Sequence, residues 1–140
     1  MVFGIKAGKT DVTKGRLEGE GYREVARELA SRFGARRVAI TLRESRSASD
    51  NGWSAVLYDE GAFYKSKKYQ IHIVDRVGGG DAFAGGLIYG LSSGLGPHRS
   101  LEFAVGASCL KQTIEGDFNV VSVGEVTALI DGDESGRVQR

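Results

Sequence analysis

The first strong pattern along the chain is an apolar stripe of helical period between Gly21 and Phe33. Its members recur at i, i+3, i+4, i+7, i+8 and i+11, and charged residues fill the opposite face. They are Tyr22, Val25, Ala26, Leu29, Ala30 and Phe33. The pattern predicts an amphipathic helix, and Gly34 is a suitable residue for ending it in the left-handed conformation.

Short apolar runs after this helix predict strands. The expected strands are 38–42, 53–58, 63–69 and 71–74. The run 38–42 has the character of a buried strand, so that helix, short loop and strand make half of a βαβ unit. A polar segment, 43–52, follows the first of these strands, and its part of mixed charge, 43–47, is expected to be a solvated loop rather than a nucleic-acid patch. Asp59–Gly61 has turn chemistry and predicts a hairpin between the strands on either side of it.

The C-terminal part of the chain is richest in helix signals. The expected helices are 82–91, 101–113 and 123–130. The first of these is apolar almost all round, which predicts a helix buried on every side. Ser122 and Glu125 form a capping box for the last one. The polar tail 131–140 is expected to be frayed. The whole pattern is that of an α/β protein.

Composition narrows the class of protein. The 140 residues make one domain, and 19 basic against 18 acidic residues give a net charge of +1, which argues against nucleic-acid binding. The single cysteine, Cys109, allows no intrachain disulfide, and with only two histidines it argues against a zinc site, so no metal ligands are expected. No apolar run approaches the roughly 18 residues that span a bilayer. Without a secretory signal, these features favour a cytoplasmic protein with no membrane partner.

Two glycine-rich segments do not match the known phosphate-binding motifs that they resemble. Three residues separate Gly4 from Gly8, where the P-loop requires four before its Gly-Lys-Thr. Gly78 and Gly80 begin a dinucleotide-binding fingerprint, but Phe83 stands where its third glycine is needed.

The segment Asp75–Gly86 has the chemistry of a different phosphate site. Three glycines, 78–80, allow the backbone to expose its N–H groups, and a helix begins directly after them. The unpaired amides and the dipole of that helix favour an anion. Asp81 has the wrong charge to bind phosphate but is suited to orient a hydroxyl beside one, which indicates phosphoryl transfer to an alcohol. A tight turn with Asp81 as the helix N-cap explains the same residues equally well.

The same segment resembles the C-terminal signature of the ribokinase-like (PfkB) carbohydrate kinases. That signature has a strand-end aspartate, small residues, a glycine-rich run ending in aspartate, and a helix rich in small residues. Arg76 departs from it, because most members carry a small residue or proline there. The chain is most similar to the 2-keto-3-deoxygluconate kinases of the family, through Ile40–Ser45, Asn51–Trp53, Val74–Tyr89 and Asp117–Asn119.

The resemblance implies the reaction and its central residues. Asp81 would be the catalytic base that accepts the proton of the sugar's primary hydroxyl. The amides of Gly78, Gly79, Gly80 and Asp81 would form the anion hole for the γ-phosphoryl group of ATP. Mg²⁺ would arrive on ATP and keep several waters, so that no dense carboxylate cluster is required.

The resemblance also implies a nucleotide site. Thr41 and Arg43 would lie near the ATP phosphates, although many members have glycine where Arg43 stands. His72, Ala104 and Ser108 would lie near the adenine. The alternatives are that His72 is an ordinary strand residue and Ser108 an ordinary buried small residue. Lys111 and the Glu115–Asn119 turn would border the nucleotide or a monovalent cation.

The family's chains are much longer than this one. Their N-terminal half carries most of the sugar-binding residues, a β-sheet lid and an Asn-x-x-Glu motif, and none of these is found here. The chain is therefore expected to be a single partial domain, 1–140, forming the C-terminal half of a three-layer α/β/α fold. An exposed strand edge and uncovered apolar surface would favour self-association or binding of a complementary N-terminal half.

The activity implied for the whole kinase is ATP-dependent phosphorylation of 2-keto-3-deoxygluconate to its 6-phosphate, with the chain alone inactive or nearly so. One alternative is a non-catalytic nucleotide- or phosphate-binding module that acts with a partner chain. Another is a different sugar kinase of the family, such as a fructokinase, because the absent half chooses the acceptor.

Overall fold

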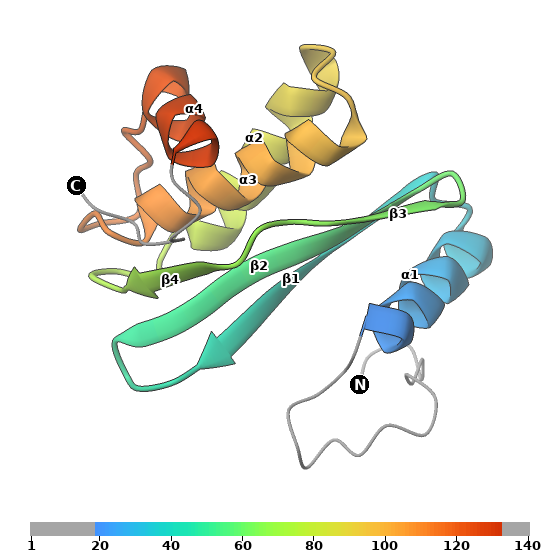
Figure 1. Ribbon diagram of the computed structural model, residues 1–140, viewed down its shortest axis with the longest axis horizontal. Helices are drawn as coiled ribbons and strands as arrows, with labels where there is room; N and C mark the ends of the chain where they lie inside the picture. The colour runs from blue at the N-terminus through green and yellow to red at the C-terminus, as the bar shows by residue number, and fades with distance from the viewer. Residues whose placement is uncertain (1–18, 133–140) are drawn as a thin grey trace.

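The computed structural model describes residues 19–132, and the Gly4–Thr10 segment lies outside them (Figure 1). The elements are α1 (Gly19–Phe33), β1 (Arg37–Ser45), β2 (Asp50–Asp59), β3 (Ala62–Lys65), β4 (Tyr69–His72), α2 (Gly79–Ser92), α3 (Pro97–Lys111) and α4 (Val123–Asp131). They form three layers: α1 covers one face of the sheet, and α2, α3 and α4 lie on the other. This is the expected α/β/α arrangement.

The sheet is built around β2. It pairs antiparallel with β1 on one side and with β3 and β4 on the other. Between β3 and β4, the Ser66 hydroxyl accepts a hydrogen bond from the Ala55 N–H at 2.9 Å, so the two short strands behave as one interrupted strand. All pairings among residues 19–132 are antiparallel. Helix α1, a short loop and β1 follow one another as predicted, and the strand that would complete a βαβ unit before α1 falls outside the described residues.

Two hairpins connect the first three strands. The Glu60–Gly61 turn has φ values of 46° and 102°, the left-handed conformations that a two-residue hairpin turn requires, as the sequence predicts. The expectation of a loop over 43–47 is wrong at 43–45, because much of the polar segment 43–52 belongs to the two strands. Both strands continue into it, and the backbone amides of Arg46 and Ser47 donate to the Asp50 carbonyl at 3.1 Å to close a short turn. Polar side chains are tolerated there because β1 is an edge strand.

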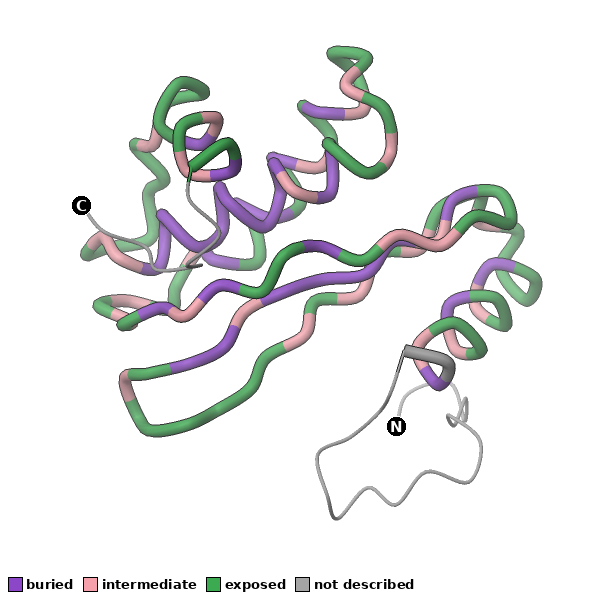
Figure 2. Tube along the Cα trace, viewed as in Figure 1, coloured by how far each residue is buried: buried purple, intermediate pink, exposed green. Residues whose placement is uncertain are grey.

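The main core lies between β2 and the helices α2 and α3. Its fully or almost fully buried members are Ala55, Leu57, Tyr69, Ile71, Phe83, Leu101, Ala104, Val105 and Cys109. Burial raises the pKa of the Cys109 thiol, so that it stays protonated. The central element is α3, which is buried without a break from Phe103 to Gln112 (Figure 2). A smaller core fixes α4 against the opposite side of α3.

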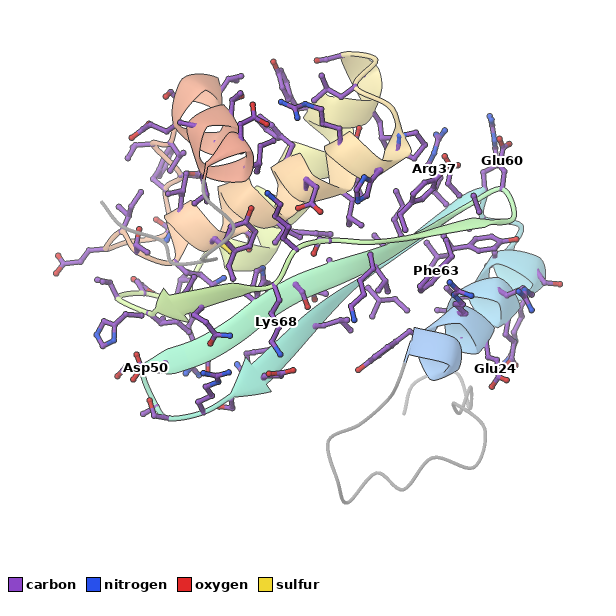
Figure 3. All side chains as sticks on the ribbon, in the orientation of Figure 1. Glu24, Arg37, Asp50, Glu60, Phe63 and Lys68 are labelled. Atoms are coloured by element: carbon purple, nitrogen blue, oxygen red, sulfur yellow. The ribbon has the colours of Figure 1, made fainter. Side chains whose placement is uncertain are left out.

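The opposite face of the sheet packs against α1. Val38, Ile40 and Leu42 on β1 are half-buried on this side, whereas Ala39 and Thr41 on the alternate positions are exposed. Phe63 on β3 joins the same face, with the Arg23 guanidinium of α1 5.0 Å from its ring centre (Figure 3). The prediction of a buried strand at 38–42 is wrong, because alternate positions of β1 are exposed and only β2 pairs with it among residues 19–132. Within the described residues, no strand pairs with the outer edge of β1.

The prediction that α2 is buried on every side is also wrong. Its buried face contacts α3 closely through glycine: a Cβ at Gly86 would lie 3.0 Å from Ala104 Cα, and one at Gly90 would lie 2.8 Å from Ser100 Cα. No element of the described range covers the opposite face, where Ile88 is 65% exposed. The sequence indicates an apolar helix but does not say which neighbours cover it.

The ends of the other helices follow local signals. Gly34 ends α1 with a φ of +65°, and Ser122 and Glu125 form both hydrogen bonds of the predicted capping box. Helix α3 begins at Pro97, earlier than expected, because proline lacks only an N–H that the first turn leaves unpaired. Asp131, predicted to be frayed, is the last residue of α4 and accepts two hydrogen bonds of 2.9 Å from Arg99. Residues 133–140 are outside the described range.

Within residues 19–132, no helix is both long enough and apolar enough to cross a membrane.

Two glycines of α2 should respond in opposite directions to alanine. Gly90→Ala places a methyl group 2.8 Å from Ser100 and should destabilise the chain by about 1–3 kcal/mol through overpacking. Gly85→Ala meets nothing within 4 Å and should stabilise it by up to about 1 kcal/mol through helix propensity. Urea unfolding of both variants measures the difference, and equal effects would contradict the close approach of α2 and α3.

Candidate functional site

The candidate site is the turn that leads from β4 into α2. Gly78 adopts a φ of 78°, and the N–H of Ala82 donates to its carbonyl at 2.8 Å as the first hydrogen bond of the helix. A Cβ at position 78 would lie only 2.4 Å from the carbonyl oxygen of Asp117. Glycine is therefore required here both by the backbone conformation and by the lack of space.

Helix α2 begins without a side-chain cap. No side chain among the described residues accepts a hydrogen bond from the amides of its first turn, and the N–H groups of Gly80 and Asp81 have no acceptor within the helix. Asp81 is exposed in that first turn and does not cap it, so the interpretation of Asp81 as an N-cap is wrong. Exposed amides at the positive end of a helix dipole are suited to bind a phosphoryl group.

The C-terminal end of α3 holds the glycine turn in place through hydrogen bonds and packing. The Ser108 hydroxyl donates to the Gly79 carbonyl at 2.8 Å, and both groups are buried. The Gln112 carbonyl accepts hydrogen bonds from the amides of Val74 and Asp75 at 2.9 and 3.2 Å. The Gln112 side chain lies against Gly79, where an added Cβ would be 3.1 Å from its Cγ. The sequence analysis missed Gln112, whose only signal is a polar residue four positions after Ser108 at the end of an apolar helix.

Asp75 ties the same turn to the segment that follows α3. Its Oδ1 accepts a hydrogen bond from the Val77 amide at 2.9 Å, and its Oδ2 accepts one from the Gly116 amide at 3.0 Å. These bonds, the one from Val77 above all, hold the pKa of Asp75 below its usual value. Arg76, which departs from the family signature, donates to the Ala48 carbonyl at 2.6 Å and so connects the turn to the β1–β2 hairpin.

Thr41 and Arg43 lie on the exposed edge strand β1. Cross-strand pairing sets them beside Ala55 and Trp53, and directly opposed residues share a face, so both lie on the face of the sheet that carries α3. No hydrogen bond or ion pair joins either of them to Gly78–Asp81 among the residues described.

The three residues predicted to lie near adenine are on two elements: His72 is on β4, and Ala104 and Ser108 lie one turn apart on α3. His72 ends β4, is largely exposed, and has its Nδ1 2.9 Å from Oδ1 of Asp50, which is labelled in Figure 3. Ala104 and Ser108 are completely buried. Neither is accessible to a nucleotide in this structure, which favours a packing role for Ala104 beneath Gly86 and a loop-holding role for Ser108.

An apolar groove of about 620 Å³ adjoins the turn. Gly78 and Asp81 line it together with residues of α2, α3, α4 and the segment before α4. The aromatic lining residues are Tyr89, Phe103 and Phe118. Anion-binding amides, an exposed carboxylate and an open groove thus meet at one end of α2, an arrangement suited to phosphoryl transfer.

The profile of the pfkB family carbohydrate kinases matches residues 24–122. The chain belongs to the PfkB family of carbohydrate kinases. Its match includes the glycine turn, Asp81 and the end of α3 that holds them.

Three relatives place the chain within the PfkB family. The 2-dehydro-3-deoxygluconokinase of Thermotoga maritima is 48% identical, with a TM-score of 0.80 over 84% of this chain and 36% of its own. A PfkB family carbohydrate kinase of Listeria grayi is 28% identical, with a TM-score of 0.72 over 83% of this chain and 36% of its own. The 2-dehydro-3-deoxygalactonokinase of Haloferax volcanii is 30% identical over 112 residues, 80% of this chain and 33% of its own. The chain therefore spans about a third of the length of these relatives.

Membership of the PfkB family implies ATP, generally with Mg²⁺. The uncapped amides of Gly80 and Asp81 and the left-handed turn at Gly78 fit a phosphate group. Mg²⁺ would reach the site on the phosphates of ATP, and no protein ligand is assigned to it.

Asp75→Asn should lower the melting temperature at pH 7, because an amide group accepts the two backbone hydrogen bonds less well than a carboxylate. The folded-state pKa of Asp75 lies below its unfolded value of about 3.8, so its contribution is present above that pH and is lost as the pH falls through the folded-state pKa. The difference between wild type and Asp75→Asn should therefore shrink below about pH 4. Thermal melts from pH 2.5 to 7 measure it, with the exposed Glu115→Gln as the control. A difference that is constant with pH would show that the carboxylate charge contributes nothing.

Proposed function

We propose that this chain is the part of a sugar kinase that binds ATP and carries the catalytic base, with 2-keto-3-deoxygluconate as the first candidate acceptor. The observation that carries the proposal is the uncapped start of α2, where free amides and the exposed carboxylate of Asp81 lie within one turn. The 48% identity to the Thermotoga maritima 2-dehydro-3-deoxygluconokinase supports this choice of acceptor.

The proposed reaction uses two groups of this chain. The amides of Gly80 and Asp81 donate hydrogen bonds to oxygens of the γ-phosphoryl group, in an orientation that Gly78 and Gly79 fix through the turn. The Asp81 carboxylate accepts the proton of the sugar hydroxyl as that oxygen bonds to phosphorus and the bond to ADP breaks. The Mg²⁺ that accompanies ATP would supply compensating positive charge for the phosphates, and no residue of this chain is assigned to hold it.

We assign the remaining nucleotide contacts to the open side of the sheet. Thr41 and Arg43 are exposed on the face that carries α3, which suits contacts with the ATP phosphates. His72 is exposed at the end of β4 and is the remaining candidate for a contact with adenine. A cytoplasmic location is part of the proposal, since Cys109 is free and buried.

A complementary polypeptide is part of the same proposal. The chain spans about a third of its relatives, and two of its surfaces suit an interface: the open edge of β1 and the exposed face of α2 around Ile88. The sugar-binding residues that the family resemblance assigns to an N-terminal half would come from that partner. A second copy of this chain is the other possible occupant of these surfaces.

The deciding measurement is ADP release from ATP-Mg with 2-keto-3-deoxygluconate, for this chain alone and with a separately produced N-terminal half of a related kinase. We expect turnover only in the mixture. Turnover by the chain alone would mean that self-association builds the sugar site. ATP binding without turnover in either case would favour a non-catalytic binding module, and a faster rate with fructose would favour a fructokinase.

Asp81→Asn should reduce turnover of the complemented enzyme by about 100-fold or more, because the amide cannot accept the hydroxyl proton. Binding of ATP-Mg should be retained, since the backbone amides are unchanged. Asp131→Asn, which removes an exposed carboxylate on α4, is the matched control and should keep wild-type turnover. Turnover within threefold of wild type in Asp81→Asn would exclude Asp81 as the base.

A further inference from the structure

Lys111 is the largest completely buried side chain among the described residues. It lies at the last position of α3, and its ammonium donates to the Ile114 carbonyl at 3.4 Å, a long hydrogen bond. A buried ammonium with such weak compensation is costly, and a methionine would fill the same space without that cost. A retained buried charge of this kind calls for a functional explanation.

The position of Lys111 supplies one. Its Cε would be 3.1 Å from a Cβ at Gly78, so the lysine stem lies directly against the glycine turn. The carbonyl of Asp117 lies against the same Cβ position of Gly78. The ammonium therefore occupies the space between the glycine turn and the segment 114–117, where Ile114 accepts its hydrogen bond.

The carboxylate of Asp75 completes this arrangement. Asp75 bonds to the amide of Val77, just before the glycine turn, and to the amide of Gly116 in the segment 114–117, and the charge of Lys111 contributes to its lowered pKa. Lys111 and Asp75 thus connect the glycine turn to the segment 114–117 through complementary hydrogen bonds. The Lys111 ammonium donates to a carbonyl, and the Asp75 carboxylate accepts from amides.

We infer that Lys111 is a positioning residue and the built-in cation of the phosphate site. Its ammonium fixes the 114–117 segment against Gly78, and its charge raises the affinity of the amides at the start of α2 for a phosphoryl group. At this turn it supplies a positive charge that belongs to the chain itself, so that no bound monovalent cation is needed there. This inference rests on the proposed function, because it assigns a role in binding ATP.

The test compares the affinity of the full chain for ATP-Mg in three variants by isothermal titration calorimetry. Lys111→Met keeps the shape and removes the charge, and should weaken binding by about tenfold or more. Lys111→Arg keeps the charge and should recover most of the affinity. Lys65→Met, at an exposed position on β3, is the control and should bind as wild type does. Thermal melts establish that each variant is folded.

A second measurement addresses the built-in cation directly. Wild type should bind ATP-Mg equally, within twofold, in potassium chloride and in tetramethylammonium chloride of the same ionic strength. If Lys111→Arg is unstable, Lys111→Ala replaces it in the calorimetric comparison. Added ethylammonium should then restore the affinity of Lys111→Ala for ATP-Mg, because a small cation can enter the space that the side chain vacates.

The outcomes separate this inference from the proposed function. A wild type that does not bind ATP-Mg overturns the proposed function, and the role of Lys111 with it. A wild type that binds, together with Lys111→Met of equal affinity, overturns only the role of Lys111. Strong potassium dependence of the wild type also overturns it, as does an equal loss of affinity in the methionine and arginine variants.

Discussion

The candidate site depends on the contact between the buried end of α3 and the glycine turn. Ser108 donates to the Gly79 carbonyl, and the Gln112 carbonyl receives the amides of Val74 and Asp75, so one helix holds the turn at both of its ends. Because α3 is enclosed by the sheet, α2 and α4, it is the most constrained element of the described chain. A loop fixed to such an element keeps its amides oriented before a ligand arrives, which is the preorganisation that electrostatic catalysis requires.

The same contact explains why α2 is rich in glycine. Gly86 and Gly90 leave no room for a Cβ against Ala104 and Ser100, so α2 and α3 approach more closely than side chains would permit. That approach brings the start of α2 within hydrogen-bonding distance of Ser108. The packing face of α2 therefore sets the position of its N-terminal amides, and substitutions far from the site can move it.

The structural features that the sequence predicts correctly are those that depend on residues adjacent in sequence. The Ser122–Glu125 capping box, the Glu60–Gly61 turn and the end of α1 at Gly34 each depend on a few adjacent positions, and all are found where expected. The failures concern what lies beside an element. An apolar strand such as 38–42 and an apolar helix such as 82–91 have the same pattern whether or not a neighbour covers them.

The same distinction between local and distant contacts applies to the residues of the candidate site. The glycine turn and Asp81 form a contiguous motif, so the sequence is sufficient to find them. Ser108, Gln112 and Lys111 act on that motif from more than 25 residues away, and nothing in their local pattern indicates it. Ser108 was singled out only through family resemblance, and the structure gives it a hydrogen bond to the backbone of the turn.

In the proposed kinase, the exposed face of α2 would link partner binding to catalysis. Asp81, Ala84, Gly85 and Ile88 are all exposed and follow helical spacing, so they form one stripe that starts at the proposed base. A polypeptide that covers Ile88 and Ala84 must also approach Asp81, within two turns of the same helix. A general base acts only on a hydroxyl held within hydrogen-bonding distance. The surface that needs a partner for burial is thus continuous with the carboxylate that needs a positioned substrate, and one docking event could satisfy both requirements.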